Sequence, residues 1–351
     1  MHRGILVRAT LVVTVLAALI AAGSVTAAGP ARTVATAAVA HPVAIEEATR
    51  LSFRLRPVDG VEFVPNARNV AIRSTSAGPL LLFLPATRSV PNDYREFLDA
   101  ASSVGYHVLA LDYWNRGRSV ARTCAQDARC YGALQANRFD GSHPTAYSAV
   151  SPNDSILARL THALQTLHRR DPAGGWERYL GPDGVRWNRI VLAGHSQGGG
   201  ESAFIAHGHR VQGVLMFASP VETDNGIVAD WMAAAGVTPT SRYFGFDDTH
   251  DMYFDRIQGS WAALGLGSRG PQAVLASDPP PTGTHTLVTD LDLGAPDAAH
   301  SLIITDAGPR GERNVPVFRE VWLWMLRAVR AAAAGTPGHA PAILHAVSAV
   351  P

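Results

Sequence analysis

The sequence predicts an α/β fold in which a doubly wound, mostly parallel sheet is covered by helices on both faces. Continuous apolar runs such as "PLLLFLPAT" and "RIVLAG" are typical of strands that are buried on both faces. Longer stretches with apolar residues at helical spacing separate these runs. Of the 351 residues, 47% are hydrophobic and 17% are charged, which is enough apolar material for a large core. Ligands are therefore expected beyond the carboxyl ends of the strands.

From about residue 50 onward, predicted strands alternate with predicted helices. Strands are expected at residues 67–76, 79–87, 106–114, 189–194, 211–219, 241–246 and 284–294. Helices are expected at residues 93–105, 153–170, 199–208, 255–267 and 316–334. Two segments lack this alternation, and we expect a surface excursion at 115–152 and a small cap at 221–240.

The N-terminal region has the features of an export signal. Arg3 and Arg8 precede an apolar stretch that is too short for a membrane span, and small residues around Ala27 and Ala28 fit a cleavage site. An uncleaved anchor is the alternative. The predicted organisation is a signal peptide at 1–28, a flexible leader at 29–48, one α/β domain at 49–334 and a flexible tail at 335–351. We expect a secreted protein without stable membrane insertion.

The two cysteines, Cys124 and Cys130, lie close together in the sequence. In an oxidising compartment they are expected to form a local disulfide across a turn, because one helix would hold them too far apart. Two free thiols are the alternative. A zinc site built from four cysteines is excluded.

The charge composition narrows the possible chemistry. The formal net charge is +1, which does not favour nucleic acid as a partner. The sequence contains no lysine, so Schiff-base chemistry, Walker-type phosphate loops and Ser-Lys dyads are excluded. A nucleophilic serine in this chain would need a histidine as its base.

The segment Gly194-His195-Ser196-Gln197-Gly198 fits the pattern Gly-x-Ser-x-Gly. It follows a predicted strand and opens a predicted helix, which is the context of a nucleophile elbow. A serine on such a tight turn needs small neighbours, and the helix N-terminus favours a developing negative charge. A glycine-rich turn without a catalytic role is the alternative interpretation.

With this elbow, the sequence resembles the α/β-hydrolase superfamily over roughly residues 50–330. The run "LLLFLPAT" is similar to the third strand and oxyanion loop of that family, and "VLALDYWNRGRS" is similar to its fourth strand and the loop that follows. The resemblance implies the chain order nucleophile, acid, histidine, and a Ser-His-Asp triad that uses neither a cofactor nor a metal.

The resemblance places the acid after a late strand. Asp248 follows Gly245 by three residues and is the preferred acid. The alternatives are Asp247, Asp251 and, after the preceding strand, Asp224.

The resemblance places the base after the last strand and before the closing helix, which favours His300. His285, expected within the strand, and His250, in the acid loop, are the alternatives. His195 belongs to the elbow and is expected to point away from the base position. His107 is expected to have a structural role in a strand.

Two backbone N–H groups are expected to stabilise the oxyanion. One is that of Gln197, and the other is that of Ala86 or Thr87, since Pro85 has no N–H.

The predicted function is a secreted serine hydrolase that cleaves small-molecule, lipid or polymeric carboxylic esters through an acyl-enzyme. Peptide hydrolysis, amide hydrolysis or acyl transfer on the same fold is the first alternative. A non-catalytic secreted binding protein is the second. Tyr113, Trp114 and Trp231 are candidates for the site lining.

Overall fold

The computed structural model describes residues 48–57, 60, 62–75, 77–267, 272–273 and 283–335. The predicted signal peptide, and all but one residue each of the predicted leader and tail, lie outside these ranges. No helix within the described ranges is long and apolar enough to cross a membrane.

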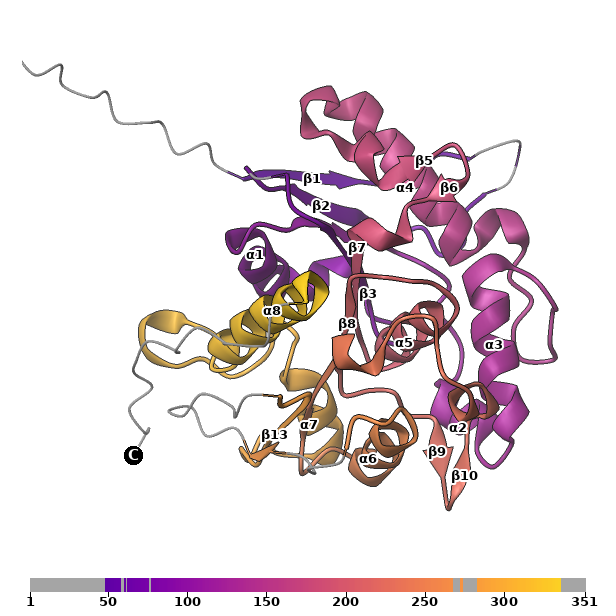
Figure 1. Cartoon of the computed structure of the whole chain (residues 1–351), viewed down its shortest axis with the longest axis vertical. Helices are drawn as coiled ribbons and strands as arrows, with labels where there is room; N and C mark the ends of the chain where they lie inside the picture. The colour runs from indigo at the N-terminus through magenta and orange to yellow at the C-terminus, as the bar shows by residue number, and fades with distance from the viewer. Residues whose placement is uncertain are drawn as a thin grey trace, which may run out of the picture. The chain divides into compact units, whose positions relative to one another are not determined.

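A mostly parallel sheet forms the centre of the described part of the chain (Figure 1). Its nine described strands are β1 (Thr49–Phe53), β2 (Asn69–Arg73), β3 (Leu80–Leu84), β4 (His107–Ala110), β7 (Ile190–His195), β8 (Gly213–Phe217), β11 (Tyr243–Asp248), β12 (Gln272–Ala273) and β13 (Thr286–Thr289). They lie in the order β1-β2-β4-β3-β7-β8-β11-β13-β12. The β1–β2 and β2–β4 pairs are antiparallel, and the other neighbours pair in parallel. The described residues also form two small hairpins, β5 (Leu180–Gly181) with β6 (Gly184–Val185) and β9 (Thr223–Asp224) with β10 (Ile227–Val228).

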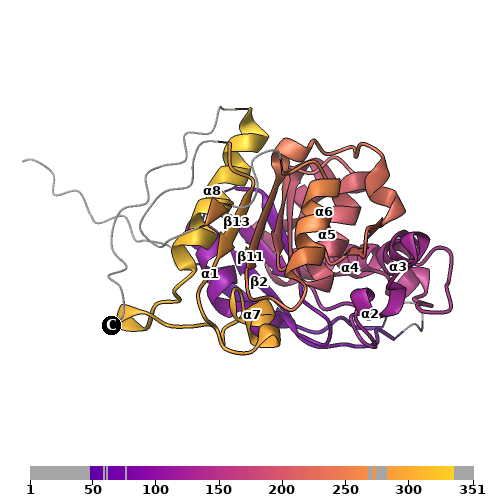
Figure 2. The same cartoon turned by 90° about the horizontal axis from the view of Figure 1, so that it is seen from below.

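Helices cover both faces of the sheet. Their bounds are α1 (Arg95–Ser103), α2 (Val120–Cys124), α3 (Ala128–Asp140), α4 (Ile156–Arg170), α5 (Gln197–Gly208), α6 (Phe254–Ala263), α7 (Pro296–Leu302) and α8 (Arg319–Ala334). In Figure 2, α1 and α8 lie on one side of the sheet, and α3, α4, α5 and α6 lie on the other. The predicted doubly wound fold is confirmed.

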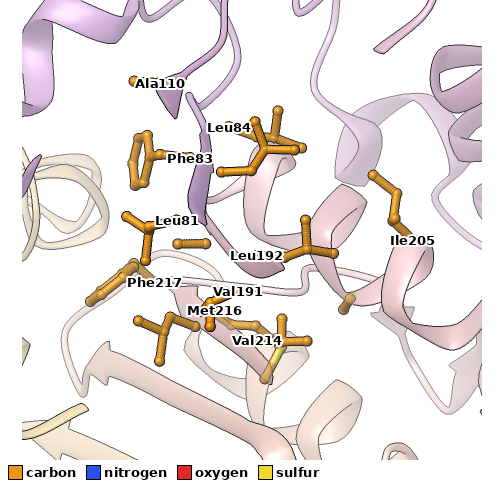
Figure 3. Close-up of a cluster of buried hydrophobic side chains, with 14 of the residues drawn as sticks. Leu81, Phe83, Leu84, Ala110, Val191, Leu192, Ile205, Val214, Met216 and Phe217 are labelled. Carbon is orange, nitrogen blue, oxygen red and sulfur yellow. The ribbon is translucent and has the colours of Figure 1, made fainter. Parts of the chain in front are cut away.

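The core follows from the continuous apolar strands. All five residues of β3 are fully buried, because helices cover both of its faces. On the face that α1 and α8 cover, Phe97 packs edge-on against Phe217 and Trp322, with ring centroids 5.0 and 6.0 Å apart. In Figure 3, Phe83, Leu81 and Phe217 lie on the left of the view, and Leu84 and Ile205, a residue of α5, lie to their right.

Each predicted strand and helix overlaps an observed element, but three regions differ from the prediction. Residues 115–152 are not simply a surface excursion, because they contain α2 and α3, and Tyr131 and Leu134 of α3 are buried. The region 221–240 holds the β9–β10 hairpin, and Trp231 within it is buried. Helix α7 lies where we expected a loop; its signal was Pro296 at the first helical position.

The predicted disulfide between Cys124 and Cys130 is present. Cys124 ends α2, Cys130 lies in the first turn of α3, and their Cα atoms are 5.2 Å apart. The bond therefore crosses the turn between two helices, as the spacing requires.

Candidate active site

The Gly-x-Ser-x-Gly segment forms a sharp turn between β7 and α5. Ser196 has φ 52° and ψ −117°, a conformation that residues with a side chain rarely adopt. A Cβ atom on Gly194 would overlap the carbonyl of Gly198, and one on Gly198 would overlap the carbonyl of Leu84. Strand, turn and helix approach so closely that only glycine fits at both positions.

Ser196, His300 and Asp251 form a hydrogen-bonded chain. His300 Nε2 lies 2.8 Å from Ser196 Oγ, and His300 Nδ1 lies 2.6 Å from Asp251 Oδ2. In the tautomer that satisfies both contacts, Nδ1–H donates to the carboxylate and Nε2 accepts from the hydroxyl. Asp251 is 5% exposed and His300 is 9% exposed, so solvent only weakly screens the electrostatic interactions among the three hydrogen-bonded side chains.

The three side chains come from loops and elements at one edge of the sheet. Ser196 follows β7, Asp251 follows β11, and His300 lies in α7 after β13. The chain order is therefore nucleophile, acid, histidine, on a strand-turn-helix elbow within a mostly parallel sheet. The chain has the α/β-hydrolase fold.

Comparisons with known proteins give distant structural likenesses. No model of a protein family matches the chain, and no curated protein sequence matches it. An S-formylglutathione hydrolase from Agrobacterium tumefaciens is 12% identical, with 83% of this chain and 96% of that chain covered and a TM-score of 0.43. Carboxyl esterase 2 from Tuber melanosporum is 9% identical, with 83% and 89% covered and a TM-score of 0.40. An acylaminoacyl peptidase from Pyrococcus horikoshii is 10% identical, with 79% and 40% covered and a TM-score of 0.42.

Within this α/β-hydrolase fold, Asp248 does not make the contact with His300 that we expected of the triad acid. Its Oδ1 accepts the backbone N–H of His250 at 2.8 Å and lies 3.0 Å from His250 Nδ1. The carboxyl group thus closes the turn after β11, as aspartates in turns often do. The contact with His300 is made by Asp251, whose Oδ1 also accepts the backbone N–H of Tyr253 at 2.7 Å. The structure therefore brings Asp251, and not the preferred Asp248, to His300.

The other candidate acids and bases lie away from the His300–Ser196 contact. Asp247 is fully buried on β11; burial, together with the nearby Asp251, holds its pKa well above the usual range. Asp224 lies on the β9–β10 hairpin. His285 Nδ1 contacts the carbonyl of Tyr243, and His107 Nε2 contacts that of Gly174, so both have structural partners.

The expected oxyanion donors lie near the elbow, but one of them is already engaged. The Ala86 N–H donates to the hydroxyl of Tyr94 at 3.1 Å. Gln197 is the first residue of α5, so its N–H has no acceptor within the helix. Thr87 is held against the elbow because its hydroxyl donates to Gln197 Oε1 at 2.9 Å. The N–H groups of Gln197 and Thr87 are thus the pair that fits an oxyanion best.

His195 links the elbow to the helix that carries His300. Its Nε2 donates to the backbone carbonyl of His300 at 2.9 Å, and its Nδ1 accepts from Tyr94 Oη at 2.9 Å. Burial lowers the pKa of His195 to about 3, so its ring stays neutral in both contacts. The side chain fastens α7 to the elbow, and its ring centroid lies 5.4 Å from that of His300.

A small cavity of ≈ 20 Å³ lies beside the nucleophile. Its described lining is Thr87, Ser119, Val120, Ala121, Ser196, Gln197, Gly200, Val221, Glu222 and Tyr253. Tyr113, Trp114 and Trp231, which we considered for the lining, are not in it; Tyr113 is buried and donates to the carbonyl of Pro85. Within the described ranges, no three His, Cys, Asp or Glu side chains are arranged to hold a metal ion.

The sequence reasoning missed Tyr94 and Glu222. Tyr94 gave no signal, because nothing in the sequence distinguishes it from an ordinary core tyrosine. Glu222 had a weak signal: an acidic residue, close to Asp224, follows a predicted strand at the edge where ligands bind.

Proposed function

We propose that the protein is a secreted serine hydrolase that cleaves carboxylic esters with Ser196 as nucleophile, His300 as base and Asp251 as acid. The observation that carries this proposal is the chain of short contacts, 2.8 Å from His300 to Ser196 and 2.6 Å from His300 to Asp251, at the elbow. The predicted signal peptide and the disulfide support the secreted location.

The proposed reaction proceeds through an acyl-enzyme. Ser196 Oγ attacks the ester carbonyl while its proton passes to His300 Nε2, and Asp251 stabilises the imidazolium that results. The N–H groups of Gln197 and Thr87 donate to the oxyanion, and the N-terminus of α5 adds a favourable field. The tetrahedral intermediate then expels the alcohol, which takes the proton from His300. Water repeats the same steps on the acyl-enzyme and releases the acid.

The proposal is tested by labelling the mature protein with a fluorophosphonate, which phosphonylates activated serines. We expect the wild type to be labelled and Ser196→Ala to remain unlabelled. Hydrolysis of a short-chain ester by the wild type, and a loss of roughly 10⁴-fold or more in Ser196→Ala, would agree with that result.

Two other outcomes would overturn parts of the proposal. Label that does not depend on Ser196 would favour a non-catalytic binding protein. Labelling of Ser196 without turnover of any ester, combined with turnover of an amide or a peptide, would replace the esterase activity with amidase or peptidase activity.

A further inference from the structure

The cavity beside Ser196 has a buried carboxyl group in its wall. Ser196, Gly200 and Glu222 all line this cavity, and Glu222 is 2% exposed. A Cβ atom on Gly200 would come within 2.6 Å of Glu222 Oε1. Glycine at position 200 therefore gives the carboxyl group the room to reach the cavity wall next to the nucleophile.

Two neutral side-chain donors hold the carboxyl group of Glu222. Gln135 Nε2 donates to its Oε1, and Trp231 Nε1 donates to its Oε2 at 2.6 Å. Glu201 of α5 is a second buried acid, and its Oε1 lies 3.5 Å from Nη1 of Arg138 on α3. Tyr131 and Arg256 also lie near Glu222. Arg256 donates to the carbonyl of the adjacent Thr223 and to the hydroxyl of Tyr131, but it makes no hydrogen bond or ion pair with Glu222 in the described structure.

Both buried acids have raised pKa values. Burial raises the pKa of Glu222 to about 7 and that of Glu201 to about 8. A buried carboxyl group whose hydrogen-bond donors are neutral favours keeping a proton near neutral pH. A cationic group placed in the cavity would take the place of that proton and would let Glu222 ionise.

The cavity fits the acyl side of a bound ester better than the alcohol side. The leaving alcohol must take its proton from His300 Nε2, so it lies toward His300. His300 is not in the described lining of the cavity, although Tyr253, whose ring packs edge-on against that of His300, is. Ser196 and the expected oxyanion donors Thr87 and Gln197 are also part of the lining. The volume of ≈ 20 Å³ exceeds the ~10–15 Å³ that one water requires, so the cavity has room for about one or two non-hydrogen atoms.

We infer that this cavity is an acyl subsite in which Glu222 selects short acyl groups that carry a protonated amine, such as glycyl. The inference rests on the proposed hydrolase function and names its substrate class. The ammonium donates to Glu222 from a position next to the carbonyl that Ser196 attacks. A methyl group of the same size leaves the carboxyl group without a cation, so it is selected against.

The test compares ethyl esters of three acids of equal size: glycine, propionic acid and hydroxyacetic acid. Their hydrolysis at pH 7 is followed by acid release, in the wild type, in Glu222→Gln and in Glu177→Gln. Glu177 is an exposed acid whose side chain contacts His168, so Glu177→Gln is the matched control. The readout is the ratio of kcat/KM for the glycyl ester to that for the propionyl ester. Because both rates scale with the amount of folded enzyme, this ratio is insensitive to partial misfolding.

We expect a glycyl-to-propionyl ratio above about ten in the wild type, and a fall of roughly tenfold or more in Glu222→Gln. The ratio should stay the same in Glu177→Gln. Equal rates for the glycyl and propionyl esters, or an unchanged ratio in Glu222→Gln, would overturn the inference while leaving the hydrolase function intact. Equal preference for the hydroxyacetyl ester would show that a neutral donor suffices and would overturn selection of the cation. Absence of Ser196-dependent hydrolysis of all three esters would instead count against the proposed function.

Discussion

The elbow around Ser196 and the loop after β11 contribute to the same site, but they are specified in different ways. At the elbow, close backbone contacts leave little choice. A Cβ atom at position 194 would meet Gly198 within the turn, and one at position 198 would meet Leu84 of β3, so only glycine fits at either position. The loop after β11 holds Asp247, Asp248 and Asp251, and no local rule separates them. The elbow is defined by close backbone contacts, and the acid loop by where α7 places His300.

The difference also appears in how each region satisfies its buried acids. Glu201, on the helix that begins at the elbow, lies 3.5 Å from Arg138. Asp247, on the strand that leads into the acid loop, lies near a second acid, Asp251. Both carboxyl oxygens of Glu201 and of Asp247 lack a hydrogen-bond donor among the described residues. Desolvation raises the pKa of both, so both favour the neutral form, but only the acid near the elbow has a counter-ion beside it.

The largest expected effect separates Asp251 from Asp248. Asp251→Asn removes the carboxylate that orients His300, so kcat on a short-chain ester should fall by about 10³- to 10⁴-fold. Asp248→Asn changes only the contact with His250, and a loss of less than about tenfold is expected. Steady-state rates of ester hydrolysis by the two variants decide which aspartate acts as the triad acid. If Asp248→Asn is the more damaged enzyme, the acid is Asp248, and the geometry around His300 changes when substrate binds.

The steric argument at the elbow is tested on stability with two substitutions at the ends of α5. Gly198→Ala places a Cβ atom against the carbonyl of Leu84. It should therefore lower the free energy of unfolding by about 1–3 kcal/mol. Gly208→Ala is the control, because a Cβ there meets no atom within 4 Å; it should be neutral or stabilise by up to about 1 kcal/mol. Urea unfolding measures both. Equal stabilities of the two variants would contradict the close approach of strand and helix.

The buried acid near the elbow should make stability depend on pH. Glu201 has a pKa raised to about 8, whereas the unfolded chain has the ordinary value of 4.5. The folded protein therefore holds a proton that the unfolded chain releases. The stability this contributes is complete below about pH 4.5, and it is lost as pH rises toward about 8. Glu201→Gln should flatten the fall in unfolding free energy between pH 5 and 8, by up to a few kcal/mol.

Urea midpoints at several pH values measure that slope, with Glu177→Gln as an exposed control. Part of the slope should persist in Glu201→Gln, because Glu222 also has a raised pKa. Identical slopes in wild type and Glu201→Gln would show that Glu201 is already ionised in the folded protein.

The smallest expected effect concerns the fastening of α7 to the elbow. Tyr94→Phe removes the hydroxyl that accepts from Ala86 and donates to His195, and His195 in turn holds the backbone of His300. A threefold to tenfold fall in kcat/KM is expected, corresponding to about 1 kcal/mol for a hydrogen bond. Tyr106→Phe, which removes a buried hydrogen bond to Leu326 far along the chain from the site, should leave kcat/KM unchanged. Equal values of kcat/KM for the two variants would show that the hydroxyl of Tyr94 does not help to position His300.

The sequence by itself determined the fold class and the elbow. Continuous apolar strands and amphipathic helices are local patterns, and the elbow is recognisable because its Gly-x-Ser-x-Gly pattern lies within five consecutive residues between a strand and a helix. It also identified His300 and Asp251 as candidates, although it preferred Asp248. Helix α7 was missed because only Pro296 marked it, in a stretch otherwise taken for a loop.

Only the tertiary structure decided which aspartate meets His300, that Ala86 donates to Tyr94, and that Glu222 reaches the cavity beside Ser196. The physical reason is the same in each case. The contacts of His300 and Glu222 join residues far apart in the chain, and the Ala86–Tyr94 contact, although it spans only eight residues, links the end of a strand to a separate element. A carboxyl group or an N–H has many possible local partners. Its actual partner depends on the packing of whole helices and strands, which no short stretch of sequence encodes.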